Sequence, residues 1–303
     1  MLQCSFFSYK GGSGRSSLLY NTMPFLANEL GATNTEPIVV VDLDLDSMGL
    51  SYLLHDKAFE AKFNAINVLR HDSNTGLDSA EDDIGKHPFF VGLEPIGSMV
   101  GLPGELDKSI LLLTAHSTGP DNKYMGDSNY DAKRINLDDL CKTCRIMKCK
   151  AVLFDLPAGE QLSGKKGLEQ SNKIVTVMRI TKQFREGTYE FLKERSLTTL
   201  ENKEFLIVPN AVPNIKGTPY NEDYIEKIIT EIASRTKESL TNDKGHNCNL
   251  TMCSSEQQGI NEVQRFKFEE LNLFKEQKEG CELSQDEVKA MDSYKKFAKE
   301  LAK

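Results

Sequence analysis

Three polar stretches in this sequence combine residue types and spacing that could carry chemistry. The first is the glycine-rich run KGGSGRSS, Lys10–Ser17. Successive glycines let backbone N–H groups approach phosphate oxygens, and a helix that starts directly after them adds a favourable dipole. The second stretch is DLDLD at 42–46 and the third is Asp155, each where an apolar run ends. Together they predict a phosphate-binding site with carboxylates beside it.

The apolar runs around these stretches predict how they are brought together. Residues 2–9, 37–42 and 151–154 have the continuous apolar character of buried parallel strands. Residues 16–31 have the apolar spacing of a helix, in which Pro24 predicts a kink or a broken turn. Because ligands bind outside the carboxyl ends of parallel strands, all three polar stretches are expected at one edge of the sheet.

The rest of the chain alternates in the same way. It predicts an α/β fold with a doubly wound, mostly parallel sheet and helices on both faces. We expect a single domain over residues 1–303, with an irregular elaboration at about 72–134 and a helical region at about 256–303. Further strands are expected at 109–115, 172–180, 204–212 and 249–255, and further helices at 136–148, 185–196, 221–240 and 284–303.

Length and composition limit the class of protein. With 303 residues, 39% of them hydrophobic, the chain has enough apolar material for a large core. A net charge of −8 argues against a generally basic, nucleic-acid-coating protein, so binding to nucleic acid is not favoured. The odd number of cysteines, seven, and the lack of a signal-peptide pattern predict a cytoplasmic protein. No apolar run approaches the roughly 18–20 residues of a transmembrane segment.

The glycine run departs from the common phosphate-loop pattern GxxxxGK[ST]. Tyr9 stands at its first glycine and Arg15 at its lysine. The place of the run between a strand and a helix still favours a phosphate site over an ordinary turn. A hydroxyl directly after the cation, here Ser16, can ligate Mg²⁺, and Asp155 can hold that metal through water.

The same residues resemble the ParA/MinD-like ATPases. KGGSGRSS resembles their deviant phosphate loop, KGGxGK[ST][ST], while residues 39–54 and 152–159 resemble their two switches. FLIVPNAV, 205–212, resembles the strand whose asparagine contacts adenine. The resemblance runs from Met1 to about Asn210 and covers the middle of the chain poorly. It implies a domain of the P-loop NTPase type, ATP and Mg²⁺ as cofactors, and a nucleotide-dependent homodimer.

The resemblance also implies roles for single residues. Lys10 would reach a nucleotide across the dimer interface, and Asp44 would orient the attacking water. Ser16 and Asp155 would serve the metal, and we expect the buried Asp42 to help complete its shell. Asn210 would contact the base. The residues expected to bind the nucleotide are Gly11, Gly12, Ser13, Gly14, Arg15, Ser16, Ser17 and Asn210.

Arg15 is the main departure from the family pattern. An arginine keeps the positive charge and can fork onto two phosphate oxygens, so nucleotide binding is expected to survive. It is bulkier than the lysine it replaces, and a displacement of about 1 Å can cost about a hundredfold in rate. We therefore expect slow hydrolysis rather than efficient turnover.

Two other features have structural and functional interpretations. Cys141, Cys144 and Cys149 could hold a metal, with His116, Cys248 or Cys253 as the fourth ligand, but their helical spacing favours core packing. The terminal segment SYKKFAKELAK could bind a membrane surface, but a helix docked on the domain is favoured.

The sequence therefore predicts a slow Mg²⁺-dependent ATPase that acts as a dimerisation switch for a protein partner. One alternative is an ATP-sensing binding module without turnover. Another is a relative of the bacterial tyrosine kinases, which carry a C-terminal tyrosine cluster where this chain has only Tyr294.

Overall fold

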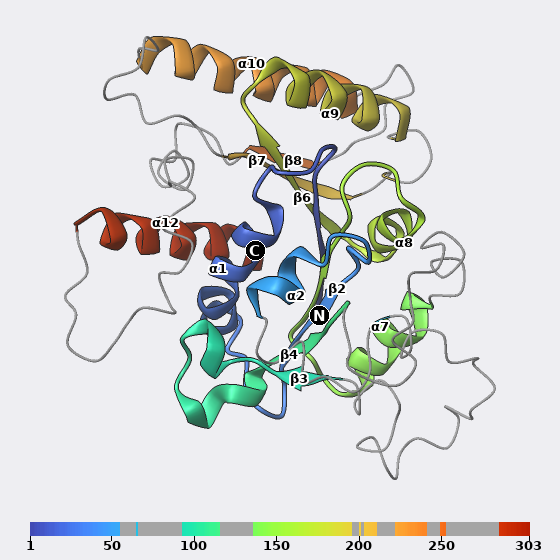
Figure 1. Ribbon diagram of the computed structural model, residues 1–303, viewed down its shortest axis with the longest axis vertical. Coiled ribbons are helices and arrows are strands. Elements are labelled where there is room, and N and C mark those ends of the chain that lie inside the picture. The colour runs from blue at the N-terminus through green and yellow to red at the C-terminus, as the bar shows by residue number, and fades with distance from the viewer. Residues whose placement is uncertain are drawn as a thin grey trace.

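The computed structural model describes residues 1–54, 65, 93–115, 136–195, 200, 203–210, 222–240, 249–252 and 285–303. Its centre is an eight-stranded sheet with the order β3-β4-β2-β5-β1-β6-β7-β8 (Figure 1). All neighbouring strands are parallel except β3, which runs antiparallel to β4 at one edge. The strands are β1 (Leu2–Phe7), β2 (Ile38–Asp42), β3 (Glu94–Pro95), β4 (Ile110–Leu113), β5 (Ala151–Asp155), β6 (Lys173–Arg179), β7 (Glu204–Asn210) and β8 (Asn249–Met252).

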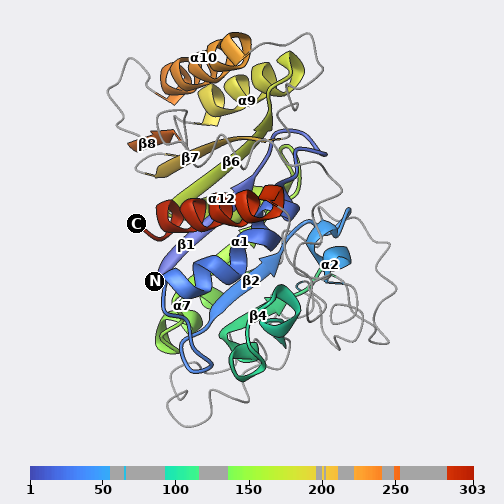
Figure 2. The same cartoon turned by 90° about the vertical axis from the view of Figure 1, so that its left-hand side faces the viewer.

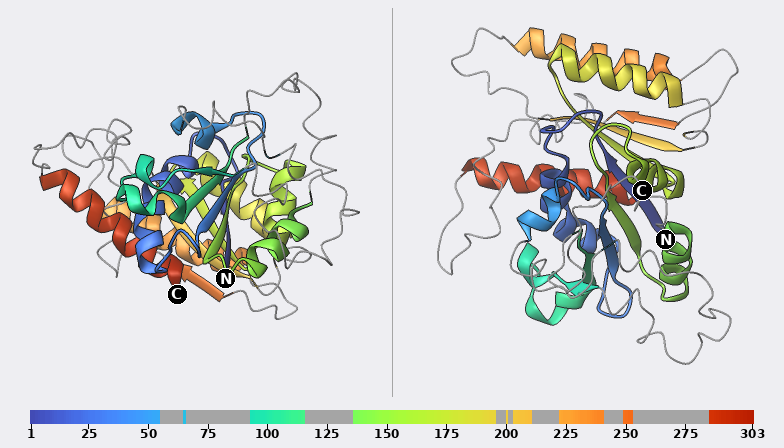
Figure 3. Two further views of the ribbon diagram at one scale, coloured as in Figure 1. Left: turned by 90° about the horizontal axis from the view of Figure 1, so that it is seen from below. Right: turned by 45° about the vertical axis from the view of Figure 1, so that its right-hand side comes forward.

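Helices cover both faces of the sheet, which confirms the predicted fold class. Figure 3 shows the sheet between α1 and α12 on one side and α7 on the other. The first face carries α1 (Arg15–Glu29), α2 (Gly49–Leu53), the 3₁₀ turns η3 (Ser98–Val100) and η4 (Gly104–Ser109), and α12 (Gln285–Ala302). The second carries α7 (Leu137–Ile146), α8 (Leu162–Gln170), α9 (Lys182–Arg195) and α10 (Glu222–Leu240).

The pleat of the central strands divides the core into two layers. In β2, Ile38 and Val40 pack under α1, while Val39 and Val41 face the layer of α7 and α8. Successive strand side chains point to opposite faces, so a strand buried on both sides must be apolar throughout. This explains the unbroken apolar run Ile38–Val41 of β2.

The register of the strands brings the predicted polar residues together at the carboxyl ends of the strands. Asp42 and Asp155 are the last residues of β2 and β5 and lie opposite each other in the parallel pair. Arg179 and Asn210 end β6 and β7 and are likewise opposite each other. The loop between β1 and α1 opens at the same edge, as expected for ligand sites in such sheets.

The terminal helix α12 is docked, as favoured from the sequence. It packs along α1 (Figure 2) and buries Tyr294, Phe297 and Leu301. Phe297 meets Phe6 edge-on, with ring centroids 6.4 Å apart. The apolar side that a membrane surface would need therefore lies in the core. No helix in the described part of the chain is long and apolar enough to span a bilayer.

The cysteine cluster is core packing, also as favoured. Cys141 and Cys144 lie on the inner side of α7, Cys149 precedes β5, and all three thiols are buried and free. Within the described residues no group of three His, Cys, Asp or Glu side chains could hold a metal ion. The fourth ligands considered, His116, Cys248 and Cys253, lie outside the described residues.

The prediction of a broken turn at Pro24 is wrong. Pro24 does not break α1, which runs as one helix from Arg15 to Glu29. Burial of Met23 and Leu26 on either side of the proline holds the helix together. Tertiary packing outweighs the loss of one backbone hydrogen bond in this helix.

Candidate functional site

The loop between β1 and α1 has a backbone that only glycine adopts readily. Gly12 and Gly14 have φ angles of +77° and +85°. At Gly14 space is also restricted, because an added Cβ would lie 2.3 Å from Nδ2 of Asn210. The glycines therefore hold the loop in a tight curve ahead of α1.

Two side chains from neighbouring strands hold the carbonyl groups of this loop. Arg179 donates through Nε to the carbonyl of Gly12 at 2.6 Å, and Asn210 donates through Nδ2 to the carbonyl of Ser13 at 2.8 Å. By contrast, none of the backbone N–H groups from Lys10 to Ser17 donates to another described residue. The loop thus keeps its donors free, which is the requirement for binding phosphate oxygens.

A cavity of about 290 Å³ lies over these donors. It brings together most of the predicted nucleotide-binding residues and Asp44. Lys10, Asp42, Asp155 and Asn210 lie outside its lining. Its walls are formed by Ser8, Gly11, Gly12, Ser13, Gly14, Arg15, Ser16, Ser17, Asp44, Ser47, Gly49, Leu53 and Ala158.

Arg15 is directed into the protein rather than along the loop. Its Nε donates to Oδ1 of Asp155 at 2.6 Å and its Nη2 to Oδ2 of Asp44 at 2.8 Å. A third nitrogen, Nη1, lies 3.4 Å from the hydroxyl of Ser8. Arg15 is only 6% exposed. Burial alone would lower its pKa, but the carboxylates of Asp155 and Asp44 outweigh that effect and raise it. The guanidinium therefore stays charged and bridges the two aspartates.

Asp42 and Asp155 are fully buried, and both have raised pKa values. Burial raises the pKa of Asp42 to about 8, with a further contribution from the charge of Asp155. The oxygens of Asp42 accept hydrogen bonds from the hydroxyl and N–H of Ser51 and from the N–H of Asp44. Burial also raises the pKa of Asp155, while the charge of Arg15 opposes this effect. The carboxylate of Asp42 thus braces the end of β2 and does not line the cavity.

The residues beside Arg15 suit a magnesium ion. Oδ2 of Asp155 is buried and has no hydrogen-bond partner among the described residues, although Oδ1 is paired with Arg15. The hydroxyl of Ser16 is close enough to Asp155 to lower the pKa of its carboxyl, and Ser16 lines the cavity. A free carboxylate oxygen and a hydroxyl are oxygen ligands of the kind that Mg²⁺ prefers.

Lys10 extends from the loop toward α9. Its Nζ lies 5.9 Å from the centre of the Phe184 ring, within the range of a cation–π contact. Lys10 is half-buried and lines no wall of the cavity of its own subunit.

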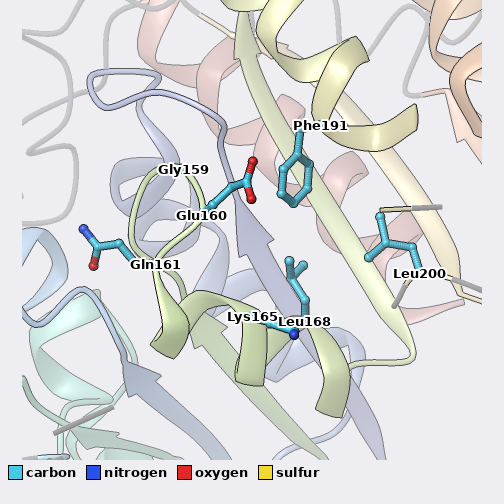
Figure 4. Close-up of a pocket in the computed structure, with 7 residues that line it drawn as sticks. All are labelled: Gly159, Glu160, Gln161, Lys165, Leu168, Phe191 and Leu200. Atoms are coloured by element: carbon cyan, nitrogen blue, oxygen red, sulfur yellow. The ribbon is translucent and has the colours of Figure 1, made fainter. Parts of the chain in front are cut away.

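A second, apolar hollow lies behind the segment that follows β5. Figure 4 shows the side chains of Leu168, Phe191 and Leu200 directed into it, with the carboxylate of Glu160 turned toward Phe191. Gly159, Gln161 and Lys165 complete its lining. None of these residues lines the loop cavity, so the two hollows are distinct.

Comparison with solved structures identifies the architecture. The septum site-determining protein MinD of Pyrococcus horikoshii, complexed with Mg-ADP, aligns over 100% of this chain and 98% of its own, with 14% identity and a TM-score of 0.52. The MinC–MinD cell division complex of Aquifex aeolicus aligns over 98% and 96%, with 14% identity and a TM-score of 0.54. A ParA family ATPase from Chlorobium tepidum aligns over 97% of both chains, with 13% identity and a TM-score of 0.51.

The chain has the fold of the MinD and ParA ATPases. No protein-family model matches the sequence, and no curated protein is significantly similar to it. The likeness therefore lies in the fold, and the roles of single residues depend on the geometry of this chain.

The sequence did not point to three of the residues around the loop. Arg179 and Phe184 contact the loop or its lysine from about 170 positions further along the chain, and Ser51 braces Asp42 from α2. Arg179 ends an apolar strand, which is where such sheets place ligand-binding residues, and this was the available signal.

Proposed function

We propose that this chain binds ATP with Mg²⁺ at the loop Lys10–Ser17, hydrolyses it slowly, and uses the nucleotide to control its own dimerisation and its association with a protein partner. The observation that carries the proposal is the loop itself. Among the described residues nothing accepts from its N–H groups, its residues line a cavity of about 290 Å³, and beside it lies a buried carboxylate with one oxygen that no described group pairs with.

The related structures support the choice of ligand and of partner class. MinD of Pyrococcus horikoshii was solved with Mg-ADP, and MinD of Aquifex aeolicus was solved in complex with the protein MinC. By analogy with these proteins of the same fold, we infer a magnesium nucleotide in the cavity and a protein partner for this chain.

The chemistry follows from the residues around the cavity. Backbone N–H groups of the loop would bind the phosphates, and Asp44 at the cavity wall would orient the water that attacks the terminal phosphate. Ser16 and Asp155 would hold Mg²⁺, which when bound supplies positive charge to the phosphate oxygens. Asp44 is also paired with Arg15, so this contact must weaken before Asp44 can act.

Because Arg15 competes with water for Asp44, slow turnover is expected. The same competition favours the ATP-sensing module among the two alternatives. If the ion pairs of Arg15 persisted in the complex, Asp44 could not accept a hydrogen bond from water, and the chain would sense ATP without hydrolysing it. The kinase alternative is disfavoured, because Tyr294 is buried in the packed face of α12 and inaccessible for phosphorylation.

The test is ATP turnover with magnesium on the full chain, beside size-exclusion chromatography with ATP and with ADP. We expect slow phosphate release and a dimer that forms with ATP and dissociates after hydrolysis. Asp44→Ala should abolish release and prolong the dimer. Asp46→Ala is the matched control, since Asp46 belongs to the same acidic run but is exposed, and it should behave as the wild type.

The outcomes separate the hypotheses. ATP binding without phosphate release, unchanged in Asp44→Ala, would identify the sensing module. Absence of both ATP binding and ATP-dependent dimerisation would overturn the proposed function.

A further inference from the structure

The site lacks the cation that usually faces the phosphates from within the loop. Arg15 occupies that position in the sequence, yet its guanidinium is buried between Asp44 and Asp155. Its positive charge is balanced by these two carboxylates. Mg²⁺ would balance only part of the negative charge of a nucleoside triphosphate, so a further cation of the protein can contribute to binding.

Arg179 does not line the cavity itself, but it contacts the loop that forms one of the cavity walls. It is the last residue of β6, which pairs directly with β1, so it lies beside the start of the loop. Its Nε donates to the carbonyl of Gly12 at 2.6 Å, and its Nη2 is 3.9 Å from the position of a Cβ on that glycine. A guanidinium has five N–H donors, and this contact uses one of them. Among the described residues no carboxylate pairs with Arg179, so its other donors can turn to a ligand.

A second cation lies close by and is unpaired in the same way. The Cζ of Arg179 is 5.8 Å from the centre of the Phe184 ring, and Nζ of Lys10 is 5.9 Å from the same centre. Within the described part of the chain Lys10 also has no carboxylate partner. Two positive charges on one ring repel each other, and an anion bound between the loop and the ring would relieve that repulsion.

We propose that Arg179 is a phosphate-binding residue of the nucleotide site, and that it supplies the positive charge that Arg15 directs into the protein. This inference rests on the proposed function and deepens it. It makes the site selective for nucleotides with more phosphates, because each added phosphate strengthens the interaction with Arg179.

The experiment measures dissociation constants of ATP and ADP with magnesium for the full chain, at low and at high salt. Arg179→Gln should weaken ATP binding about 10- to 100-fold, as expected for a hydrogen bond to a charged group, and should weaken ADP binding less. It should also make ATP affinity less sensitive to salt. Arg179→Lys keeps the charge and should recover most of the ATP affinity. Lys182→Gln removes an exposed cation three positions away and should change ATP affinity less than about threefold.

Two results would overturn the inference while leaving the proposed function intact. One is an Arg179→Gln variant that binds ATP as the wild type does. The other is a variant that loses ATP and ADP affinity equally with an unchanged salt dependence, which would mean that Arg179 only supports the carbonyl of Gly12. A wild-type chain that binds neither nucleotide would overturn the proposed function as well, so the two failures are distinguishable.

Discussion

At the scale of single residues, Arg15 determines what the site can do. Its planar guanidinium contacts two aspartates through different nitrogens, which a single lysine ammonium could not reproduce with the same geometry. Buried ion pairs repay the cost of their own desolvation only while both partners are present. Arg15 is therefore a structural counter-ion for Asp44 and Asp155 before any nucleotide binds.

Replacing Arg15 should therefore destabilise the nucleotide-free protein. Arg15→Met leaves two buried carboxylates without a counter-ion, and the free energy of unfolding should fall by about 3–5 kcal/mol. Urea denaturation without magnesium measures this loss. Adding Mg²⁺ should recover part of it, since the freed carboxylates are oxygen ligands for the ion.

The control for this variant is Lys142→Met. Lys142 forms an exposed i,i+4 ion pair with Asp138, which is worth only about 0.3–0.5 kcal/mol. Equal stability of Arg15→Met and the wild type would contradict the counter-ion role.

At the scale of elements, strands and helices with a regular apolar pattern could be predicted from the sequence. Elements and contacts that depend on distant segments of the chain could not. The central strands and the helices α1, α7, α9 and α10 have apolar periodicity and were predicted. The edge strand β3, the short helix α2 and helix α8 were not, because β3 has two residues, α2 has five, and α8 is rich in Gly and Lys.

The same division holds within the site. The glycine loop and Asp155 follow from local patterns, and the structure brings them together as expected. The pairing of Arg15 with Asp44 and Asp155, and the contact of Arg179 with Gly12, join residues far apart in sequence. No local pattern shows which way a long cationic side chain turns, so these contacts could not be predicted.

The docking of α12 gives a prediction at this scale. Phe297 is fully buried against Phe6 and β1, so Phe297→Ala should lower the free energy of unfolding by about 3–5 kcal/mol. Lys296→Ala, one position earlier and exposed, should stay within about 0.5 kcal/mol of the wild type in the same urea titration. A helix that merely lies on the surface would make the two variants alike, and that result would refute the docking.

At the scale of the whole molecule, polar residues that end or follow strands β1, β2, β5, β6 and β7 lie together at the carboxyl ends of these strands. Lys10 and Arg179 lie there without carboxylate partners among the described residues. In a two-fold dimer built face to face, these cations would be repeated across the axis and would repel each other. Nucleotide phosphates between the subunits would neutralise them, which is a physical reason why the proposed dimerisation would depend on ATP.

Mixing two inactive variants tests whether Lys10 acts on the nucleotide of the partner subunit. Lys10→Ala and Asp44→Ala are each expected to lack turnover. In a mixed dimer, the site that retains Asp44 would receive Lys10 from the other subunit, so one of its two sites is complete. Random assortment makes half of the dimers mixed, and an equimolar mixture should therefore recover about a quarter of the wild-type rate. The subunits are combined before ATP is added, and each variant alone is the control. If Lys10 served its own subunit, every site in the mixture would lack one group, and no turnover would return.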